Sequence, residues 1–286
     1  MKETLKSTSL PWQRIAHMWD SYFTVPSRIS ADELRQYEKW LKQINKSGKP
    51  LHALVMGATP ELRDALAKLG YQVHSMDINL DMFLAMDGLL KIKNPNEVLI
   101  KANWIDNPLK DGRFDVIVGD AILPNIPWNS RLDLLKEIQR LLKPRGIFLT
   151  RAFNAPVKKR FGTVEAIMEH FRGNKNTVQS ALEMVLELQY LSYDSKDRQG
   201  SFKKAKALFE KSPQTRGRKF RDKDLQKIND IVGNFWFKNF LNKIFIYAHR
   251  AQEEDSYKKY FVVSKTFEAR DHDYSEVTPM YFMRRK

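Results

Sequence analysis

The chain of 286 residues contains no cysteine. This absence excludes disulfide bonds, thiolate metal ligands and a cysteine nucleophile. No stretch approaches the roughly 18 uninterrupted apolar residues of a membrane span, so none is predicted. Residues 1–10 are polar and lack the apolar centre of a signal peptide, so we expect a cytoplasmic protein.

The usual phosphate-binding glycine patterns are also missing. Gly57 ends an apolar run but is followed by Ala, Thr, Pro, Glu and Leu. The dinucleotide fingerprint needs a second glycine for close approach of the pyrophosphate, and no Gly-Lys-Ser/Thr loop is present. The sequence therefore disfavours a cofactor bound through its phosphates.

The net charge of +15 is unevenly distributed. Residues 51–153 carry +1, residues 1–50 carry +4 and residues 154–286 carry +10. A basic surface attracts phosphates and nucleic acid, but a solvated basic face is the simpler interpretation. A nucleic-acid partner remains possible through the basic region 203–223.

Short apolar runs alternate with helical patterns through the middle of the chain. The runs predicted as strands are residues 51–56, 71–76, 97–101, 114–118 and 146–150. Buried strands that alternate with helices indicate an α/β protein with a doubly wound parallel sheet. Two further runs near the C-terminus, residues 260–265 and 280–284, predict a hairpin that completes the sheet.

The sequence patterns predict helices in most of the rest of the chain. Residues 11–45 predict N-terminal helices, with Ser30 and Glu33 as a capping box. Residues 154–225 predict a basic helical insertion, and a helix is predicted again from 235 to 251. We therefore expect a single domain over residues 1–286, with an N-terminal lid (1–50), a core (51–153), the insertion (154–225) and a closing part (226–286).

Polar residues gather where the predicted strands end. Ligands of doubly wound sheets bind at the carboxyl ends of the strands, where Gly57, Asp77 and Asp120 are expected to meet. Gly57 allows close backbone approach, and Asp77, 20 residues later, suits a ribose diol. A carboxylate at Asp120 can hold an ammonium group or act as a base, and capping of its own loop is the alternative.

Three more side chains could contact a nucleoside. Trp104 offers stacking area, and the Asn103 amide both donates and accepts hydrogen bonds, which suits an adenine edge. Met82 could lie against the adenine face. For Trp104 and Met82, packing in the core is an equally good interpretation.

With these residues, the chain resembles a class I (Rossmann-like) S-adenosylmethionine-dependent methyltransferase. The resemblance rests on the segments 54–57, 114–120 and 141–146, together with Asp77 and the pair Asn103-Trp104. Residues 12–19 and 57–62 look like a bacterial subgroup of this family. The resemblance implies a seven-stranded sheet of order 3-2-1-4-5-7-6 with strand 7 antiparallel, and S-adenosylhomocysteine as the product of the cofactor.

The resemblance also implies a set of cofactor-binding residues. These are Gly57, Ala58, Thr59, Asp77, Ile78, Met82, Asn103, Trp104, Asp120, Ala121 and Ile122. The sequence departs from the family where Val55 replaces the usual acid before the glycine, and Thr59 and Glu61 replace later glycines. The Asn/Asp-Pro-Pro-Tyr/Phe loop of amino-directed nucleic-acid methyltransferases is absent after residue 119.

Methyl transfer from a sulfonium requires mainly alignment and a dry pocket. The candidates for a catalytic base are His17, Tyr22, His170 and Asp120, and the sequence does not rank them. No carboxylate and histidine cluster indicates a metal. We expect a small-molecule or peptide acceptor, with an RNA or DNA methyltransferase or a non-catalytic S-adenosylmethionine-binding protein as alternatives.

Overall fold

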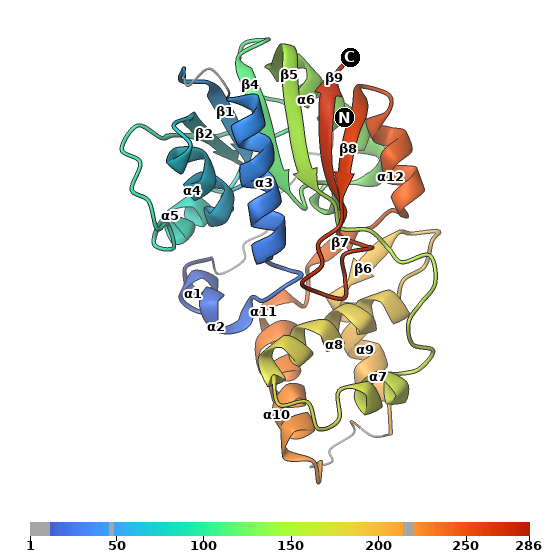
Figure 1. Cartoon of the computed structure of the whole chain (residues 1–286). Helices are drawn as coiled ribbons and strands as arrows, with labels where there is room; N and C mark the ends of the chain where they lie inside the picture. The colour runs from blue at the N-terminus through green and yellow to red at the C-terminus, as the bar shows by residue number, and fades with distance from the viewer. Residues whose placement is uncertain (1–11, 46–48, 214, 216–219) are drawn as a thin grey trace.

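The structure, a computed structural model, describes residues 12–45, 49–213, 215 and 220–286. Its centre is a seven-stranded sheet of order β3-β2-β1-β4-β5-β9-β8 (Figure 1). The strands are β1 (His52–Met56), β2 (Gln72–Asp77), β3 (Val98–Lys101), β4 (Phe114–Asp120), β5 (Leu142–Arg151), β8 (Phe261–Phe267) and β9 (Met280–Arg285). β9 runs antiparallel to both of its neighbours, β5 and β8, and every other neighbouring pair is parallel, so the predicted 3-2-1-4-5-7-6 sheet is confirmed.

Helices cover both faces of the sheet because successive strand residues point to opposite sides. Ala53 and Val55 of β1 pack in one cluster with residues of α3 and α4, whereas Leu54 and Met56 pack in another with residues of α6 and α12. The helices around the sheet are α3 (Ala31–Ile44), α4 (Pro60–Lys68), α5 (Leu80–Asp87), α6 (Arg131–Leu141) and α12 (Arg250–Tyr257), with the short 3-10 turns η1 (Leu123–Asn125) and η2 (Trp128–Ser130) before α6.

The capping box at the start of α3 is confirmed. The Ser30 hydroxyl accepts a hydrogen bond from the Glu33 N–H at 3.1 Å, and the Glu33 carboxylate accepts one from the Ser30 N–H at 2.7 Å. The helical pattern before it is interrupted: only α1 (Trp12–His17) and α2 (Trp19–Tyr22) form, and α1 lies against α5.

Residues 154–249, here called the cap, separate β5 from α12 and lie below the sheet in Figure 1, at the ends of β4 and β5. The cap has its own apolar core, to which α8 contributes Ala181, Val185 and Leu188. Its elements are α7 (Val164–His170), α8 (Thr177–Leu191), β6 (Gln199–Ser201), α9 (Phe202–Lys211), α10 (Lys223–Ile231), η3 (Val232–Phe237), α11 (Lys238–Phe240) and β7 (Ile244–Ile246).

The prediction of one helix over residues 235–251 is wrong between residues 241 and 249, and the predicted helical insertion also contains the short strand β6. The π-helix η3 and α11 end at Phe240, and β7 then pairs antiparallel with β6. A Cβ on Gly200 of β6 would lie 2.1 Å from the Tyr247 ring, so glycine permits this close approach. Two predicted features lie outside the described residues: the polar segment 1–10, and Arg216, Arg218 and Lys219 of the basic region.

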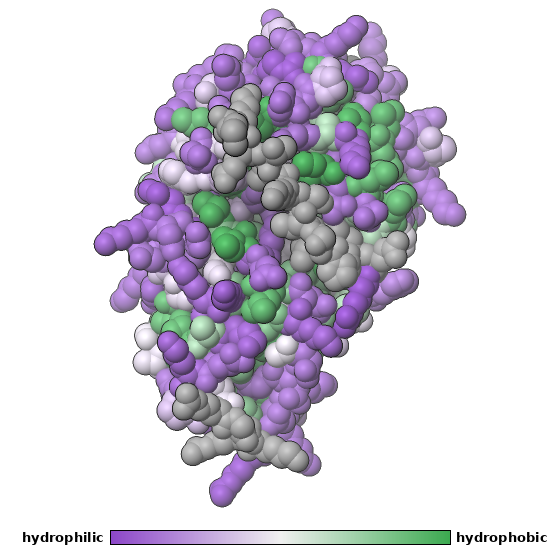
Figure 2. Space-filling view, turned by 180° about the vertical axis from the view of Figure 1, so that it is seen from behind, coloured by the Kyte–Doolittle hydropathy of each residue, from purple (hydrophilic) through white to green (hydrophobic). Residues whose placement is uncertain are grey.

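Polar side chains cover most of the face seen in Figure 2, with apolar groups in small patches between them. Scattered surface apolar residues are normal in folded proteins. Within the described ranges, no helix combines the length and apolar character required to cross a bilayer.

Candidate active site

Gly57 and Trp104 form one corner of the site at the end of β1. Gly57 has a positive φ of 98°, which favours glycine, and its N–H donates to the Met76 carbonyl at 2.9 Å. The Trp104 indole N–H donates to the same carbonyl at 2.7 Å. A Cβ on residue 57 would lie 3.7 Å from Cζ2 of Trp104, so the ring stands directly beside the glycine turn.

Asp77 is a buried carboxylate at the end of β2, with 7% of its surface exposed. It accepts a hydrogen bond from the Asn79 N–H at 2.8 Å and forms no ion pair with any residue that the structure describes. Burial raises the pKa of Asp77 from 3.8 to about 6, although the Asn79 and Ile78 N–H groups and the charge of Lys243 oppose the shift. Neutral donors such as ribose hydroxyls would suit this acceptor.

The other residues expected near the nucleoside lie around this corner. Ile78 and Met82 are half-buried, and Met82 packs beside Phe83 on α5. The Asn103 side-chain oxygen accepts from the Ile105 N–H at 3.0 Å, which leaves its amide nitrogen available. Ala58 is fully buried and has no surface to offer a ligand.

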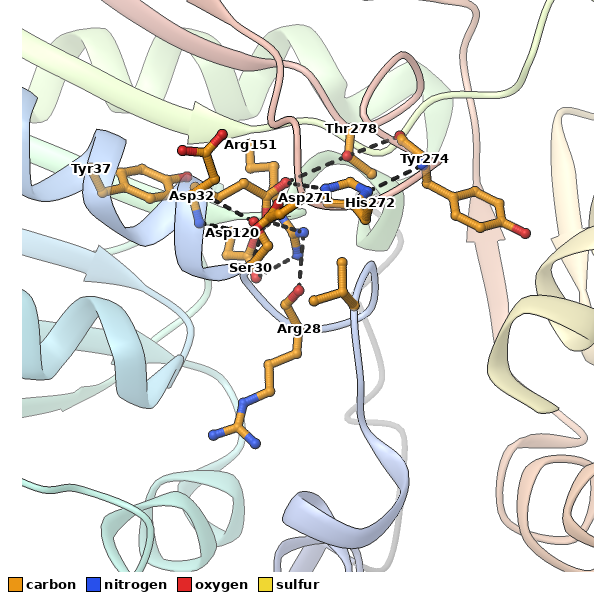
Figure 3. Close-up of polar contacts among 12 residues, drawn as sticks. Arg28, Ser30, Asp32, Tyr37, Asp120, Arg151, Asp271, His272, Tyr274 and Thr278 are labelled. Atoms are coloured by element: carbon orange, nitrogen blue, oxygen red, sulfur yellow. Dashed lines mark hydrogen bonds and ion pairs between the residues drawn. The ribbon is translucent and has the colours of Figure 1, made fainter. Parts of the chain in front are cut away.

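Asp120, at the end of β4, is held by a buried arginine (Figure 3). Its two carboxylate oxygens accept from Nε and Nη2 of Arg151 at 2.6 and 3.2 Å. The other terminal nitrogen of Arg151 donates to Glu33 at 2.9 Å and to the Arg28 carbonyl at 3.3 Å. Arg151 therefore ties the end of β4 to the start of α3.

Glu33 is the second acid of this buried network, and the loop before β9 also contacts it. His272 and the Thr278 hydroxyl lie 3.3 and 3.5 Å from the Glu33 oxygen Oε1 (Figure 3). Burial acts to raise the pKa of Glu33, but the Arg151 guanidinium and hydrogen bonds from His272 and Ser30 hold it below its ordinary value. From the sequence, Glu33 was predicted only as a cap and Arg151 was not predicted at all, although its charge directly after an apolar strand was an available signal.

The side chain of Arg28 links the N-terminal segment before α3 to the helix that follows β1. This side chain donates to Asp20 of α2 at 2.6 Å and also to Glu61 in the first turn of α4. Trp19 of α2 stacks on Phe23 with ring centroids 4.3 Å apart and packs beside Ala58. These contacts place α2 beside the first turn of α4.

A cavity of about 200 Å³, here called the chamber, lies between the strand ends and the cap. Thr59, Asp120 and Ala121 line it on the sheet side, and the cap supplies most of the remaining wall. Eight aromatic residues line it, among them Trp236 and Tyr247. This aromatic wall was not predicted from the sequence, because residues 235–251 were predicted as one helix.

Lys243 of the cap lies beside the chamber. Its Nζ donates to the side-chain oxygen of Asn125 at 2.7 Å, and Asn125 lines the chamber. Burial lowers the pKa of Lys243 to about 8, and the negative charge of Asp77 opposes this shift. The charge of Lys243 in the cap therefore interacts with the carboxylate of Asp77 at the end of β2.

The remaining predicted residues lie elsewhere. Ile122 is buried in the core under β4, 2.8 Å from where a Cβ on Gly119 would lie. Tyr22 stacks on Phe235 at 4.1 Å and does not line the chamber, and His17 and His170 are exposed. No group of three or more His, Cys, Asp or Glu side chains suited to a metal occurs in the described part of the chain.

Residues 56–150, which contain the glycine turn, Asp77 and Asp120, match a family described as a methyltransferase domain. These residues form a class I, S-adenosylmethionine-dependent methyltransferase domain. No curated protein matches the chain at a significant level.

Solved structures share the fold of this methyltransferase over nearly its whole length. The CcbJ methyltransferase of Streptomyces caelestis is 14% identical with a TM-score of 0.58, covering 98% of this chain and 99% of its own. The PH0226 protein of Pyrococcus horikoshii OT3 is 15% identical with a TM-score of 0.55, covering 96% and 99%. A 1,6-didemethyltoxoflavin-N1-methyltransferase of Burkholderia thailandensis, solved with 1,6-didemethyltoxoflavin and S-adenosylhomocysteine, is 10% identical with a TM-score of 0.52, covering 96% and 86%. At these identities the likeness shows the fold alone.

The residues at the strand ends of the methyltransferase fit its cofactor. The buried carboxylate of Asp77, which forms no ion pair with a described residue, matches two neutral hydroxyl donors. The half-buried ring of Trp104 is fixed by its own hydrogen bond and offers an aromatic surface beside Gly57. The Thr59 hydroxyl makes no N-cap bond at α4 and lines the chamber.

Proposed function

We propose that this protein methylates a small molecule held in the chamber. The observation that carries this proposal is the chamber itself, which joins the Thr59 and Asp120 side of the strand ends to an aromatic wall of the cap. A space of about 200 Å³ between the strand ends and the cap favours a small acceptor over a peptide or a duplex. A peptide would need an opening wide enough for chain on both sides of the modified residue.

The proposed cofactor contacts follow from the corner and the chamber. Asp77 would hold the ribose hydroxyls, and Trp104 with Asn103 would contact the adenine. Thr59 and Asp120 would contact the methionine portion, with Asp120 kept in place by Arg151. When bound, S-adenosylmethionine supplies an activated methyl group on a sulfonium.

The chain contributes alignment and exclusion of water. The Arg28 contacts hold the N-terminal segment over the strand ends, and the cap closes the other side. An aromatic wall also stabilises a nearby cation through the ring faces. Among the residues lining the chamber, only Asp120 is charged, and Arg151 neutralises it.

A nucleic-acid acceptor is the alternative, carried by the basic region 203–223. Its described part supports this alternative weakly, because Lys204 and Lys206 form ion pairs with Asp197 and Glu210. Salt-sensitive RNA binding by a protein without affinity for the cofactor would favour it.

Calorimetric titration with S-adenosylmethionine and S-adenosylhomocysteine tests the proposed cofactor site. Hydrogen bonds to a charged group contribute about 1.5–3 kcal/mol. We therefore expect Asp77→Ala to weaken binding about 10- to 100-fold, and Asp106→Ala, at an exposed carboxylate, to leave it unchanged. Absence of binding to the wild-type protein would refute the proposal. Binding without methylation of any acceptor in a broad screen would favour a non-catalytic S-adenosylmethionine-binding protein.

A further inference from the structure

The walls of the chamber are flat aromatic rings. Phe153 and Tyr247 are stacked at 5.9 Å with an angle of 23° between their planes, and Phe202 and Trp236 are stacked at 6.5 Å with 18°. All four rings line the chamber. Flat walls of this kind favour a planar ligand, because stacked and edge-to-face contacts add to the burial of apolar area.

The chamber offers no free charge to a ligand. Both oxygens of its single charged lining residue, Asp120, accept hydrogen bonds from Arg151. The nearby Lys243 is not part of the lining, and its Nζ donates to Asn125. The cap residues that line the chamber are all uncharged, and burying an unpaired charge is very costly, so an acceptor with a phosphate, carboxylate or ammonium group does not suit the part of the chamber that the cap encloses.

Two residues that line the chamber, Trp236 and Gln189, carry hydrogen-bond donors for which the described residues supply no acceptor. The indole N–H of Trp236 is buried, with the residue 3% exposed, and has no acceptor among the described residues. The Gln189 side-chain oxygen accepts from the Tyr247 hydroxyl at 3.1 Å, so its amide nitrogen is left without a described acceptor. A buried donor without a partner destabilises a protein unless a ligand or water supplies the acceptor.

From these three observations we propose that the methyl acceptor is a planar, uncharged heteroaromatic compound whose edge carries hydrogen-bond-accepting atoms. The indole N–H of Trp236 and the amide nitrogen of Gln189 donate hydrogen bonds to that edge, and the aromatic ring faces of the chamber pack against the plane of the compound. An apolar cavity of about 150 Å³ is large enough to bind benzene, so a chamber of about 200 Å³ has room for one or two fused rings. This inference rests on the proposed function, because it names the substrate class of the same site.

Quinoxaline and naphthalene are suitable probes, since they have the same shape and differ only in two ring nitrogens. Titrations followed by line broadening of the probe resonances give their affinities for protein saturated with S-adenosylhomocysteine. Trp236→Phe keeps an aromatic wall and removes the N–H donor. Trp128→Phe is the matched control, because Trp128 lies between Arg131 and Arg198 outside the chamber.

We expect Trp236→Phe to weaken quinoxaline about 3- to 10-fold and to change naphthalene by less than about twofold. Trp128→Phe should leave both affinities unchanged. Equal losses for the two probes would refute the role of the N–H donor. Failure of both probes to bind wild-type protein that does bind S-adenosylhomocysteine would refute the acceptor class and leave the cofactor site intact. Failure of S-adenosylhomocysteine to bind would refute the proposed function, whatever the probes do.

Discussion

Replacing Asp77 by Asn should make the free protein more stable while weakening cofactor binding. Burial raises the pKa of Asp77 from 3.8 to about 6, so the folded protein holds this proton more tightly than the unfolded chain does. The ionised carboxylate then destabilises the fold at every pH above its unfolded pKa. Asn is neutral and keeps the oxygen that accepts from the Asn79 N–H.

The magnitude follows from proton linkage. One pKa unit corresponds to about 1.4 kcal/mol. Ionised Asp77 should therefore destabilise the fold by about 3 kcal/mol at pH 8, where the effect is complete, and by about half of that at pH 5. Below the unfolded pKa of 3.8 the effect should vanish, since both states are then protonated.

Urea unfolding of the wild type and Asp77→Asn at pH 5 and pH 8 measures this difference. The variant should be more stable at both pH values, with the larger gain at pH 8. Asp106→Asn, at an exposed carboxylate, should show no such gain. A variant less stable than the wild type at pH 8, or a gain that does not shrink at pH 5, would refute the reasoning. S-adenosylhomocysteine affinity should also fall below about pH 6 in the wild type and stay flat in the variant.

Two further substitutions test the supports of the site. Arg151→Met leaves two buried carboxylates without their cation, so it should lower the free energy of unfolding by about 3–5 kcal/mol in a urea titration. The control Arg145→Met, at an exposed arginine, should change the free energy of unfolding by less than about 0.5 kcal/mol. Gly57→Ala forces a side chain into a left-handed turn beside Trp104, so it should lower stability by about 1–2 kcal/mol and also weaken S-adenosylhomocysteine binding. Gly112 also has a positive φ, but a Cβ there would meet no other atom, so Gly112→Ala should lower stability and leave the S-adenosylhomocysteine affinity measured by calorimetry unchanged. Equal S-adenosylhomocysteine affinities for the two glycine variants would contradict the proposed contact of Gly57 with the cofactor.

The sheet was predictable because its signals are local. Each strand is a short apolar run whose alternate residues face different helices, as Leu54 and Val55 do on β1. The positions of Gly57 and Asp77 also follow from the chain alone, since both come directly at or after a strand end. The capping box of Ser30 and Glu33 spans only four residues and was predicted for the same reason.

The cap was harder to predict because its structure depends on distant pairing. The segment Ile244–Ile246 becomes a strand only because Gln199–Ser201 lies beside it, and Gly200 makes room for Tyr247. Without that partner strand, the aromatic-rich pattern of residues 235–251 predicts a helix. The chamber wall was therefore absent from the sequence analysis.

The sequence alone determined the positions of the strands, the glycine turn and the acid at the end of β2, because these depend on periodicity and on turn chemistry within a few residues. The order of the strands in the sheet was implied by the resemblance to the methyltransferase family. The tertiary structure decided the rest. Arg151 reaches Glu33 across 118 positions of the chain, and the chamber is assembled from the N-terminal segment, two strand ends and the cap. Burial also shifts the pKa of Asp77, and burial is a property of the folded packing rather than of the residue.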